Sequence, residues 1–396
     1  MSPSKPLRVC FAVNHYPPAF GGHGIQLARN LSLLRARGIE PEVLTRRTGH
    51  APATSVEAGT TVHRVFSTGN SPIDKLRRVT EMRTHLRKHG HRYALLHTTV
   101  LGWELFANLG LAKRLTLPVV VELIRIGGDD PQTISQQRLG NIKIHQLRKA
   151  EHITVIAERF RNHLGPLSTL SESLSVIPTG VDLHRHSGTP SRAEARSLLG
   201  LPREGRLVLC VGALVHRKGF DRTLEAWACT PFERGRDCLV IVGPATPEEG
   251  LFDAEEETVA RLRARARQPD LDGSVRFAGR SDEIEGWMAA ADVFLLLSRH
   301  EGLGTVLLEA MASSLPCITS SLDGVAAEVV HEGVTGFIVP DADDAQAVAA
   351  RLTSLLADPS LRERQGRAGR QRAEDRFSLE ARVDALAALH RDVARP

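Results

Sequence analysis

The sequence predicts an α/β protein of two doubly wound, Rossmann-like domains, and three observations support this fold class. Short apolar runs typical of buried strands alternate with amphipathic stretches of helical length. The alternation restarts after residues 177–191, a segment rich in Pro, Gly, Ser and Thr. The chain has 396 residues, which is more than one typical hydrophobic core accommodates. Strands separated by helices in this way form parallel sheets covered on both faces.

The first half is expected to form one parallel sheet, in a domain over residues 1–185. It opens with the apolar run LRVCFAVN, residues 7–14, which is followed by a glycine-rich loop and a helix over about 25–37. Further strands are expected, in order, at PEVLT, TVHRVF, YALLH, LPVVVEL, HITVIA and LSVIP.

The second half repeats the pattern in a domain over residues 186–377. Strands are expected at RLVLCVGAL, CLVIVGP, VRFAG, DVFLLLS, PCITSS and GFIVP, and three closing helices follow them. Helices over about 219–229 and 255–267 separate the first three of these strands. We expect the two domains to face each other across a cleft at the carboxyl ends of their strands, where open α/β sheets bind ligands.

Composition excludes several classes of protein. Apolar residues make up 42% of the chain and charged residues 24%, which is ordinary for a globular protein. No apolar run is long enough for a signal peptide or a membrane span, so we expect a cytoplasmic protein. Aromatic residues are only 4%, and no nucleic-acid-binding module is recognisable, so we expect no nucleic-acid partner. No prediction of the oligomeric state follows from the sequence.

A glycine-rich loop, PPAFGGHG, directly follows the first strand. Gly21 and Gly22 would let the backbone approach a ligand closely, and the next helix would direct its positive N-terminus at the same place. The loop is not GxGxxG, which disfavours a nicotinamide cofactor in its usual form. The alternative is an ordinary strand-to-helix turn.

Two cations follow the first strand of the second half, in VGALVHRKGF. Arg217 and Lys218 precede a helix, where positive charge opposes the helix dipole, and Lys218 is the single lysine after Lys149. An anion such as a diphosphate would remove this conflict. The alternative is a pair of solvated loop cations.

Two carboxylates lie eight positions apart in SRHEGLGTVLLEAMASSLPC. Glu301 is expected in the exit loop of a buried strand, and Glu309 in the second turn of the following helix. Carboxylates suit the hydroxyls of a ribose or a sugar ring, and backbone amides at the helix start suit an anion. For Glu309 the alternative is an exposed helix carboxylate. The residues expected to present these amides are Gly302, Leu303, Gly304 and Thr305.

The segment EGLGTVLLE matches the E-x7-E signature of the retaining family 4 glycosyltransferases, which have the GT-B fold. VGALVHRKGFDRTLEAW resembles their phosphate-binding segment, SVIPTGVD their interdomain strand end, and GVTGFIVPDADD the segment after their last strand. The resemblance covers almost the full length. It implies retaining transfer of a hexose-type sugar from a nucleotide diphosphate sugar, UDP-sugar favoured and GDP-sugar next, to a glycan, lipid-linked or small-molecule acceptor. It also implies no bound metal and no cofactor besides the nucleotide sugar as co-substrate.

The resemblance assigns roles by motif. Glu301 would contact the donor sugar, Glu309 the ribose, and Arg217 and Lys218 the leaving diphosphate. Residues 378–396 resemble the C-terminal helix that crosses back to the N-terminal domain. Further donor-binding residues are expected at Gly21, Gly22 and Arg280, together with Gly302, Leu303, Gly304 and Thr305.

One departure from the family concerns a strand that ends in His-x-His. YALLHTT has only His97, with Thr99 in the second place. His97 is therefore either a catalytic residue or a packed strand histidine, and both readings stay open. DAD at residues 341–343 imitates a metal-binding DxD, but helix capping explains it better, and we expect no metal.

The acceptor is expected to bind the N-terminal domain. Residues 73–92 predict a basic amphipathic helix that could lie on an anionic membrane, which would suit a lipid-linked acceptor and a peripheral position at the inner face of the membrane. The alternative is a core-facing helix with a solvated basic face. His23, Arg125 and Asp129 follow strand ends and are candidates for contact with the acceptor. Competing functions are a GT-B-fold nucleotide-sugar epimerase and a catalytically silent nucleotide-binding scaffold subunit.

Overall fold

The chain divides into two compact units in a computed structural model that describes residues 6–47, 51–69, 71–167, 173–251 and 254–394. Unit 1 comprises residues 1–178 and 380–396, and unit 2 comprises residues 179–379. Residues 179–185, which we expected in the first domain, belong to unit 2, where Arg185 forms an ion pair with Glu285. Of the C-terminal segment 378–396, residues 395–396 lie outside the described part of the chain.

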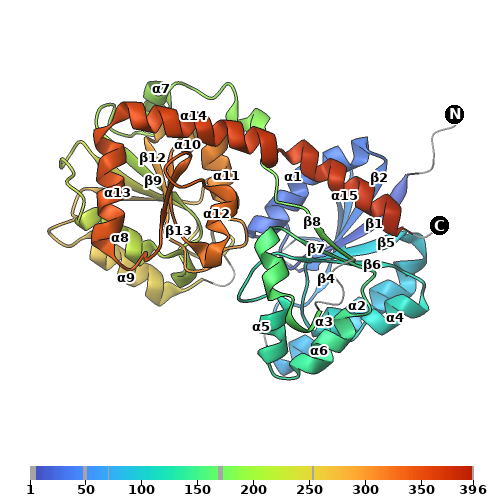
Figure 1. The fold of residues 1–396 in the computed structure, drawn as a ribbon. Helices are drawn as coiled ribbons and strands as arrows, with labels where there is room; N and C mark the ends of the chain where they lie inside the picture. The colour runs from blue at the N-terminus through green and yellow to red at the C-terminus, as the bar shows by residue number, and fades with distance from the viewer. Residues whose placement is uncertain (1–5, 48–50, 70, 168–172, 252–253, 395–396) are drawn as a thin grey trace. The chain divides into compact units, whose positions relative to one another are not determined.

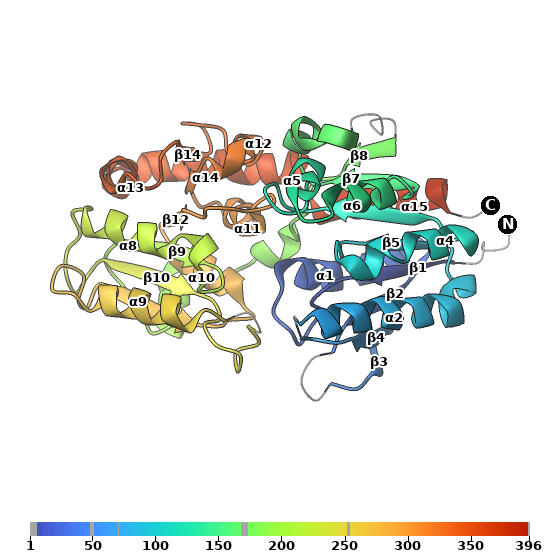
Figure 2. The same ribbon diagram turned by 90° about the horizontal axis from the view of Figure 1, so that it is seen from below.

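Unit 1 is built on an eight-stranded sheet. Its strands are β1 (Leu7–Ala12), β2 (Ile39–Arg46), β3 (Thr54–Glu57), β4 (Thr60–Phe66), β5 (Leu95–Thr98), β6 (Val119–Leu123), β7 (His152–Val155) and β8 (Leu174–Val176). Their order is β3-β4-β2-β1-β5-β6-β7-β8, and all pairs are parallel except β3 with β4 (Figures 1 and 2). The strand order reverses between β1 and β5, which makes their carboxyl ends the expected ligand-binding edge.

The helices of unit 1 follow its strands. They are α1 (Gly22–Ala36), α2 (Pro72–His89), α3 (Trp103–Phe106), α4 (Leu109–Arg114), α5 (Pro131–Gln136), α6 (Gly140–Leu147) and α15 (Leu379–Val393). Helix α2 begins with a capping box, in which Ser71 and Asp74 each accept a hydrogen bond from the other's backbone N–H. As expected, α15 returns to unit 1, where Arg382 donates a 2.6 Å hydrogen bond to Glu122 of β6 (Figure 1).

Unit 2 has a six-stranded, fully parallel sheet in the order β11-β10-β9-β12-β13-β14. The strands are β9 (Leu207–Val211), β10 (Cys238–Val242), β11 (Val275–Gly279), β12 (Val293–Leu296), β13 (Cys317–Ser320) and β14 (Gly336–Val339). This order again reverses at one point, between β9 and β12, as in doubly wound dinucleotide-binding domains. Strand residues such as Val208, Leu239 and Leu295 are fully buried and form the core.

Helices cover both faces of the unit 2 sheet. They are α7 (Arg192–Leu198), α8 (Phe220–Ala228), α9 (Glu256–Ala266), α10 (Ile284–Ala290), α11 (Thr305–Ala312), α12 (Ala326–Val329), α13 (Ala345–Ala357) and α14 (Pro359–Arg376). Helices α8, α9 and α13 pack together on one side, and α7, α10, α11 and α14 on the other (Figures 1 and 2). The predicted fold class, two parallel-sheet α/β domains, is therefore confirmed.

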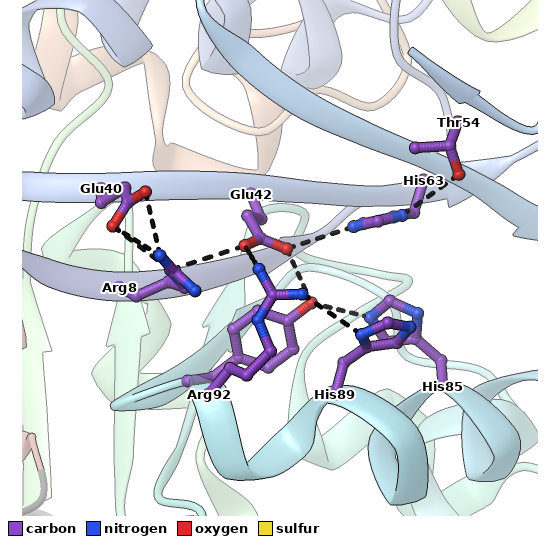
Figure 3. A network of polar contacts seen from close by, with 9 residues as sticks. Arg8, Glu40, Glu42, Thr54, His63, His85, His89 and Arg92 are labelled. Carbon is purple, nitrogen blue, oxygen red and sulfur yellow. Dashed lines mark hydrogen bonds and ion pairs between the residues drawn. The ribbon is translucent and has the colours of Figure 1, made fainter. Parts of the chain in front are cut away.

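A buried polar network in unit 1 surrounds Glu42 of β2 (Figure 3). The carboxylate of Glu42, 5% exposed, accepts hydrogen bonds from His63 at 3.1 Å, Arg92 at 3.1 Å and Tyr93 at 3.0 Å. Burial alone would raise the pKa of Glu42, but the hydrogen bonds from His63 and Tyr93 and the Arg92 charge lower it to about 2. Three histidine rings, His63, His85 and His89, pack side by side within this network, with centroids 4.8–5.7 Å apart.

Helix α2 buries only part of its apolar stripe. Met82 and Leu86 are buried, but Ile73 and Leu76 are 78% and 66% exposed. The first turns of α2 therefore present apolar side chains to solvent beside the exposed Lys75. In the described part of the chain, no helix has the length and apolarity that a membrane crossing requires.

Candidate functional site

The end of β9 positions the predicted pair of cations in unit 2. Arg217 and Lys218 lie in a short 3-10 turn, His216–Lys218, that connects β9 to α8. Gly219 closes this turn with φ +66°, and a Cβ there would lie 2.0 Å from the carbonyl oxygen of Leu297. Only glycine fits this position, so the turn holds the two cations close to the loop that follows β12.

Glu301 lies in that loop and contacts both cations. Its Oε1 accepts hydrogen bonds from Lys218 Nζ and, at 2.8 Å, from Ser298 Oγ, and its Oε2 lies 3.7 Å from Arg217 Nη1. The Lys218 and Glu301 side chains are 10% and 11% exposed, whereas Arg217 is 44% exposed. The structure thus brings together three of the predicted catalytic residues, and Ser298 is a partner that sequence reasoning missed.

The charges of this group influence one another. Burial lowers the pKa of Lys218, and the Glu301 charge opposes that effect. Burial would raise the pKa of Glu301, but the charges of Lys218 and Arg217 bring it below its usual range. Two basic side chains thus share one carboxylate, an arrangement that suits an anion.

Helix α11 begins just after Glu301. Gly304 is its N-cap and Thr305 its first residue, so the backbone amides of this turn lie at the positive end of the helix dipole. Gly302 lies in the connecting loop, and Leu303 is 2% exposed. Glu309 lies in the second turn of α11 and is 6% exposed, so the alternative of an exposed helix carboxylate does not hold.

Arg280 lies at the end of β11, two strands away from β9 in the sheet order. It donates hydrogen bonds to Asp282 at 3.0 and 3.1 Å and to the Glu249 carbonyl oxygen at 3.0 Å. Among the interactions of the described residues, none joins Arg280 to the Lys218–Glu301 pair. Its place in the donor site therefore remains a prediction.

A cavity of about 390 Å³ opens beside this group, where β12, β13 and β14 end. Its polar lining includes Arg222, Ser298, His300 and Asp343. Asp343, part of the metal-like DAD motif, forms a bidentate ion pair with Arg222, and Asp344 caps α13. Within the described ranges, no cluster of His, Cys, Asp or Glu side chains could hold a metal ion.

In unit 1, the glycine-rich loop leads into the first turn of α1. Gly21 is the N-cap of α1. Gly22 is exposed, and a side chain there would meet nothing within 4 Å, which leaves room for a ligand. Gly24 is the glycine that the fold requires, because a Cβ there would lie 1.9 Å from the His15 carbonyl oxygen.

Glu122 of β6 links several of the unit 1 candidates. Its carboxylate, 3% exposed, accepts a 2.6 Å hydrogen bond from Arg382, and its Oε2 lies 3.6 Å from His23 Nε2 and 3.5 Å from His97 Nε2. Burial would raise the pKa of Glu122, but the Arg382 charge and the neighbouring histidines hold it well below its usual range. A lone carboxylate in the apolar run LPVVVEL was the sequence signal for this residue.

His97 and His23 differ in their exposure. His97 is 3% exposed, and its Nδ1 lies 2.8 Å from Nε2 of His390 in α15, which is how a packed strand histidine lies. His23 is 26% exposed, and burial lowers its pKa to about 4, an effect that the Glu122 charge only partly opposes. At neutral pH His23 is therefore an uncharged hydrogen-bonding group at the surface of unit 1.

The other acceptor-side candidates form a separate pair. Arg125 Nη2 lies 3.7 Å from Asp129 Oδ1, and the two side chains are 45% and 19% exposed. Burial raises the pKa of Asp129, and the charge of Arg125 partly offsets this increase. The neighbouring Asp130 caps α5 and has a structural role.

Two family profiles match the chain. The profile described as Glycosyl transferases group 1 matches residues 191–372, and the one described as Glycosyl transferase 4-like domain matches residues 21–180. The D-inositol 3-phosphate glycosyltransferase of Kineococcus radiotolerans is 27% identical over an alignment that covers 94% of this chain and 90% of that protein.

Solved structures share the fold. The sucrose-phosphate synthase of Thermosynechococcus elongatus superposes with a TM-score of 0.82 at 23% identity, over 98% of both chains. Anabaena HepE, solved in complex with UDP-glucose, superposes with a TM-score of 0.77 at 20% identity, over 98% of this chain and all of HepE. At this level of identity, the likeness concerns the fold alone.

Proposed function

The chain belongs to the glycosyltransferases of the family 4 type, and we propose that it transfers a hexose-type sugar from a nucleotide diphosphate sugar with retention of configuration. A UDP-sugar is the favoured donor and a GDP-sugar the next choice. The acceptor is a glycan, a lipid-linked sugar or a small molecule. No metal ion takes part in the proposed reaction.

The observation that carries this proposal is the group formed by Arg217, Lys218 and Glu301. Two cations beside the N-terminus of α11 suit a diphosphate, and a carboxylate suits sugar hydroxyls. HepE, which shares the fold, was solved with UDP-glucose, and this supports a uridine nucleotide. Glu309 is the proposed partner of the ribose hydroxyls, and Arg280 completes the proposed donor site.

The proposed chemistry needs stabilisation of a leaving group more than a protein nucleophile. As the bond between the anomeric carbon and the diphosphate oxygen breaks, negative charge grows on the diphosphate. Arg217, Lys218 and the amides of α11 are preorganised to stabilise that charge. The acceptor hydroxyl attacks the same face of the sugar and passes its proton to the departing diphosphate, so the configuration is retained.

For the acceptor, we assign contacts to the exposed groups of unit 1. His23 is uncharged at neutral pH and partly exposed, and the pair formed by Arg125 and Asp129 offers a hydrogen-bond donor and an acceptor. His97 acts through packing, as its contact with His390 supports. An Asp129→Asn variant is expected to raise the KM for the acceptor and leave the KM for the donor unchanged. An unchanged acceptor KM would remove Asp129 from the site.

A lipid-linked acceptor is supported by the exposed end of α2. Ile73 and Leu76 project into solvent beside Lys75, and Leu139 and Ile142 at the start of α6 are 52% and 48% exposed. Exposed apolar side chains beside lysines match the interface of an anionic bilayer. We therefore include peripheral membrane contact through residues 73–92 in the proposed function.

The experiment measures binding and slow hydrolysis of UDP-, GDP- and ADP-sugars by the purified protein, with and without EDTA. Turnover of one donor is expected to survive EDTA and to fall at least about a hundredfold in Lys218→Ala and Glu309→Ala. Arg261→Ala is the control, because Arg261 is exposed on α9 and contacts Glu257 and Thr258 of the same helix. The protein should keep full activity in this variant.

Other outcomes separate the competing functions. Conversion of a nucleotide sugar into its epimer, without transfer to any acceptor, would indicate an epimerase. Tight nucleotide binding with no turnover on any acceptor would indicate a scaffold subunit. Binding of no nucleotide at all would refute the donor site.

A further inference from the structure

The Lys218–Glu301 contact joins the group expected to bind the donor diphosphate to the group expected to bind the donor sugar. The two residues follow neighbouring strands, β9 and β12, so their side chains meet at one point of the sheet edge. Both are about nine-tenths buried. Solvent screens such a pair poorly, so each charge depends strongly on the other.

Only some of the hydrogen-bond donors of Lys218 are engaged in this pair. An ammonium has three donors, and among the hydrogen bonds of the described residues Glu301 is the side-chain acceptor for Lys218. Glu301 itself is shared, because Ser298 Oγ donates to the same Oε1 at 2.8 Å and Arg217 lies 3.7 Å from Oε2. One carboxylate thus serves two cations, and Lys218 keeps donors for a further partner.

We propose that Glu301 is an internal counterion of the anion site, which the donor diphosphate displaces. In the free enzyme Glu301 neutralises Lys218, and on binding Lys218 turns to the phosphate oxygens and releases Glu301 to the sugar hydroxyls. Ser298 is a positioning residue that keeps hold of Glu301 during the exchange. This inference rests on the proposed donor site and adds an order of events within it.

Two physical reasons favour the exchange. A buried ammonium without a partner is costly, so the empty site needs an internal anion. A diphosphate carries more negative charge than one carboxylate and offers several acceptor oxygens, so it is the better partner for Lys218 and Arg217 together. The carboxylate then becomes available only when a donor has arrived.

The exchange predicts that loss of Glu301 strengthens the binding of a diphosphate. Calorimetry on the full chain would measure the affinities of inorganic diphosphate, UDP and GDP for the protein and for Glu301→Gln. We expect UDP and inorganic diphosphate to bind about tenfold tighter to Glu301→Gln, because no carboxylate competes for Lys218. Sugar transfer by this variant should be lost. Unchanged or weaker diphosphate binding would overturn the proposal.

Ser298→Ala is the matched control, since it removes a hydrogen bond to Glu301 but not its charge. Its affinity for UDP should stay within about twofold of the original, while kcat falls and KM changes little. Glu301→Gln in a Lys218→Met background should no longer strengthen diphosphate binding. A similar gain in that background would show that the effect does not act through Lys218.

Thermal unfolding checks that each variant is folded. Glu301→Asp serves as a second variant, because it retracts the charge by one methylene and should tighten diphosphate binding by about threefold. The proposed function fails separately: binding of inorganic diphosphate but of no nucleotide would refute the donor site and leave the exchange intact. Nucleotide binding that Glu301→Gln and Glu301→Asp do not tighten would refute the exchange alone. Failure of inorganic diphosphate and of every nucleotide to bind would refute both.

Discussion

His85 in α2 makes the stability of unit 1 depend on pH. Its ring is 6% exposed, and its Nε2 lies 3.0 Å from the hydroxyl oxygen of Tyr93, which donates its own proton to Glu42 (Figure 3). His85 is therefore a neutral donor. Burial lowers its pKa to about 3, and the neighbouring His63 and His89 add to this effect.

The pKa of His85 in the unfolded chain is about 6.5. Between about pH 3 and about pH 6.5 the unfolded state binds a proton that the folded state does not. The free energy of unfolding therefore rises with pH across this window, by about 1.4 kcal/mol per pH unit. This stabilisation is lost as the pH falls towards the folded-state pKa. From neutral pH to about pH 5, His85 alone lowers the free energy of unfolding by about 2 kcal/mol.

His85→Gln tests this value, because an amide still donates to Tyr93 but does not titrate. Near neutral pH we expect a loss of about 1 kcal/mol of stability. The further decrease on going to about pH 5 should be about 2 kcal/mol smaller than in the unchanged protein. Urea unfolding would be followed by Trp103 fluorescence with Trp227 and Trp287 replaced by Phe, since Trp103 is then the only tryptophan and reports on unit 1.

The control is His145→Gln, because His145 is an exposed histidine of α6 in the same unit. It should leave the pH dependence of unfolding unchanged. If the stability of His85→Gln decreases on acidification as steeply as that of the original protein, the assignment is wrong. His85 would then have to have the same pKa in the folded and unfolded states.

Three further predictions concern a turn, a buried ion pair and a surface. Gly219→Ala should cost about 3 kcal/mol of stability in thermal unfolding, because φ is +66° and the new Cβ would clash with a carbonyl oxygen; an unaffected midpoint would contradict this. Arg382→Met should cost about 3–5 kcal/mol by removing the arginine that pairs with the buried Glu122, and adding Glu122→Gln should restore most of it; no rescue would argue against an electrostatic cause. Ile73→Asp should weaken co-sedimentation with anionic vesicles about tenfold or more, whereas Val56→Asp, 72% exposed on β3, should not; equal effects would exclude a specific role of α2.

Most of the fold could be predicted because most of its strands are buried on both faces and form continuous apolar runs in the sequence. The strand that was not predicted is β3, Thr54–Glu57, whose only apolar residue is Val56 and which pairs as an antiparallel edge strand. The apolar stripe of α2 was recognised, but not its division into a buried and an exposed part. Periodicity shows which residues share a face, but not how far the surface that covers them extends.

Part of the candidate site could also be predicted from the sequence, and part could not. Arg217, Lys218 and Glu301 were predicted to lie together because parallel strands end at one edge of the sheet. Glu122 was passed over within an apolar strand, and its partner Arg382 lies 260 positions away. Local patterns carry no information on such a contact, which depends on the return of α15 to unit 1.

Two largely buried carboxylates, Glu122 and Glu301, lie near the carboxyl ends of strands. They differ in how many hydrogen-bond donors of their cationic partners, Arg382 and Lys218, are already engaged. Arg382 donates to Glu122 through one terminal nitrogen and to two backbone carbonyl oxygens at 2.9 Å through the other. Its terminal nitrogens are engaged, so an incoming anion would have to break hydrogen bonds that hold α15 to β6 and to the segment that follows β8. Lys218, in contrast, shares its carboxylate with two other donors and has a flexible stem. Exchange of partners therefore costs much less at Lys218, which is why we assign anion binding to unit 2 and a structural role to the pair in unit 1.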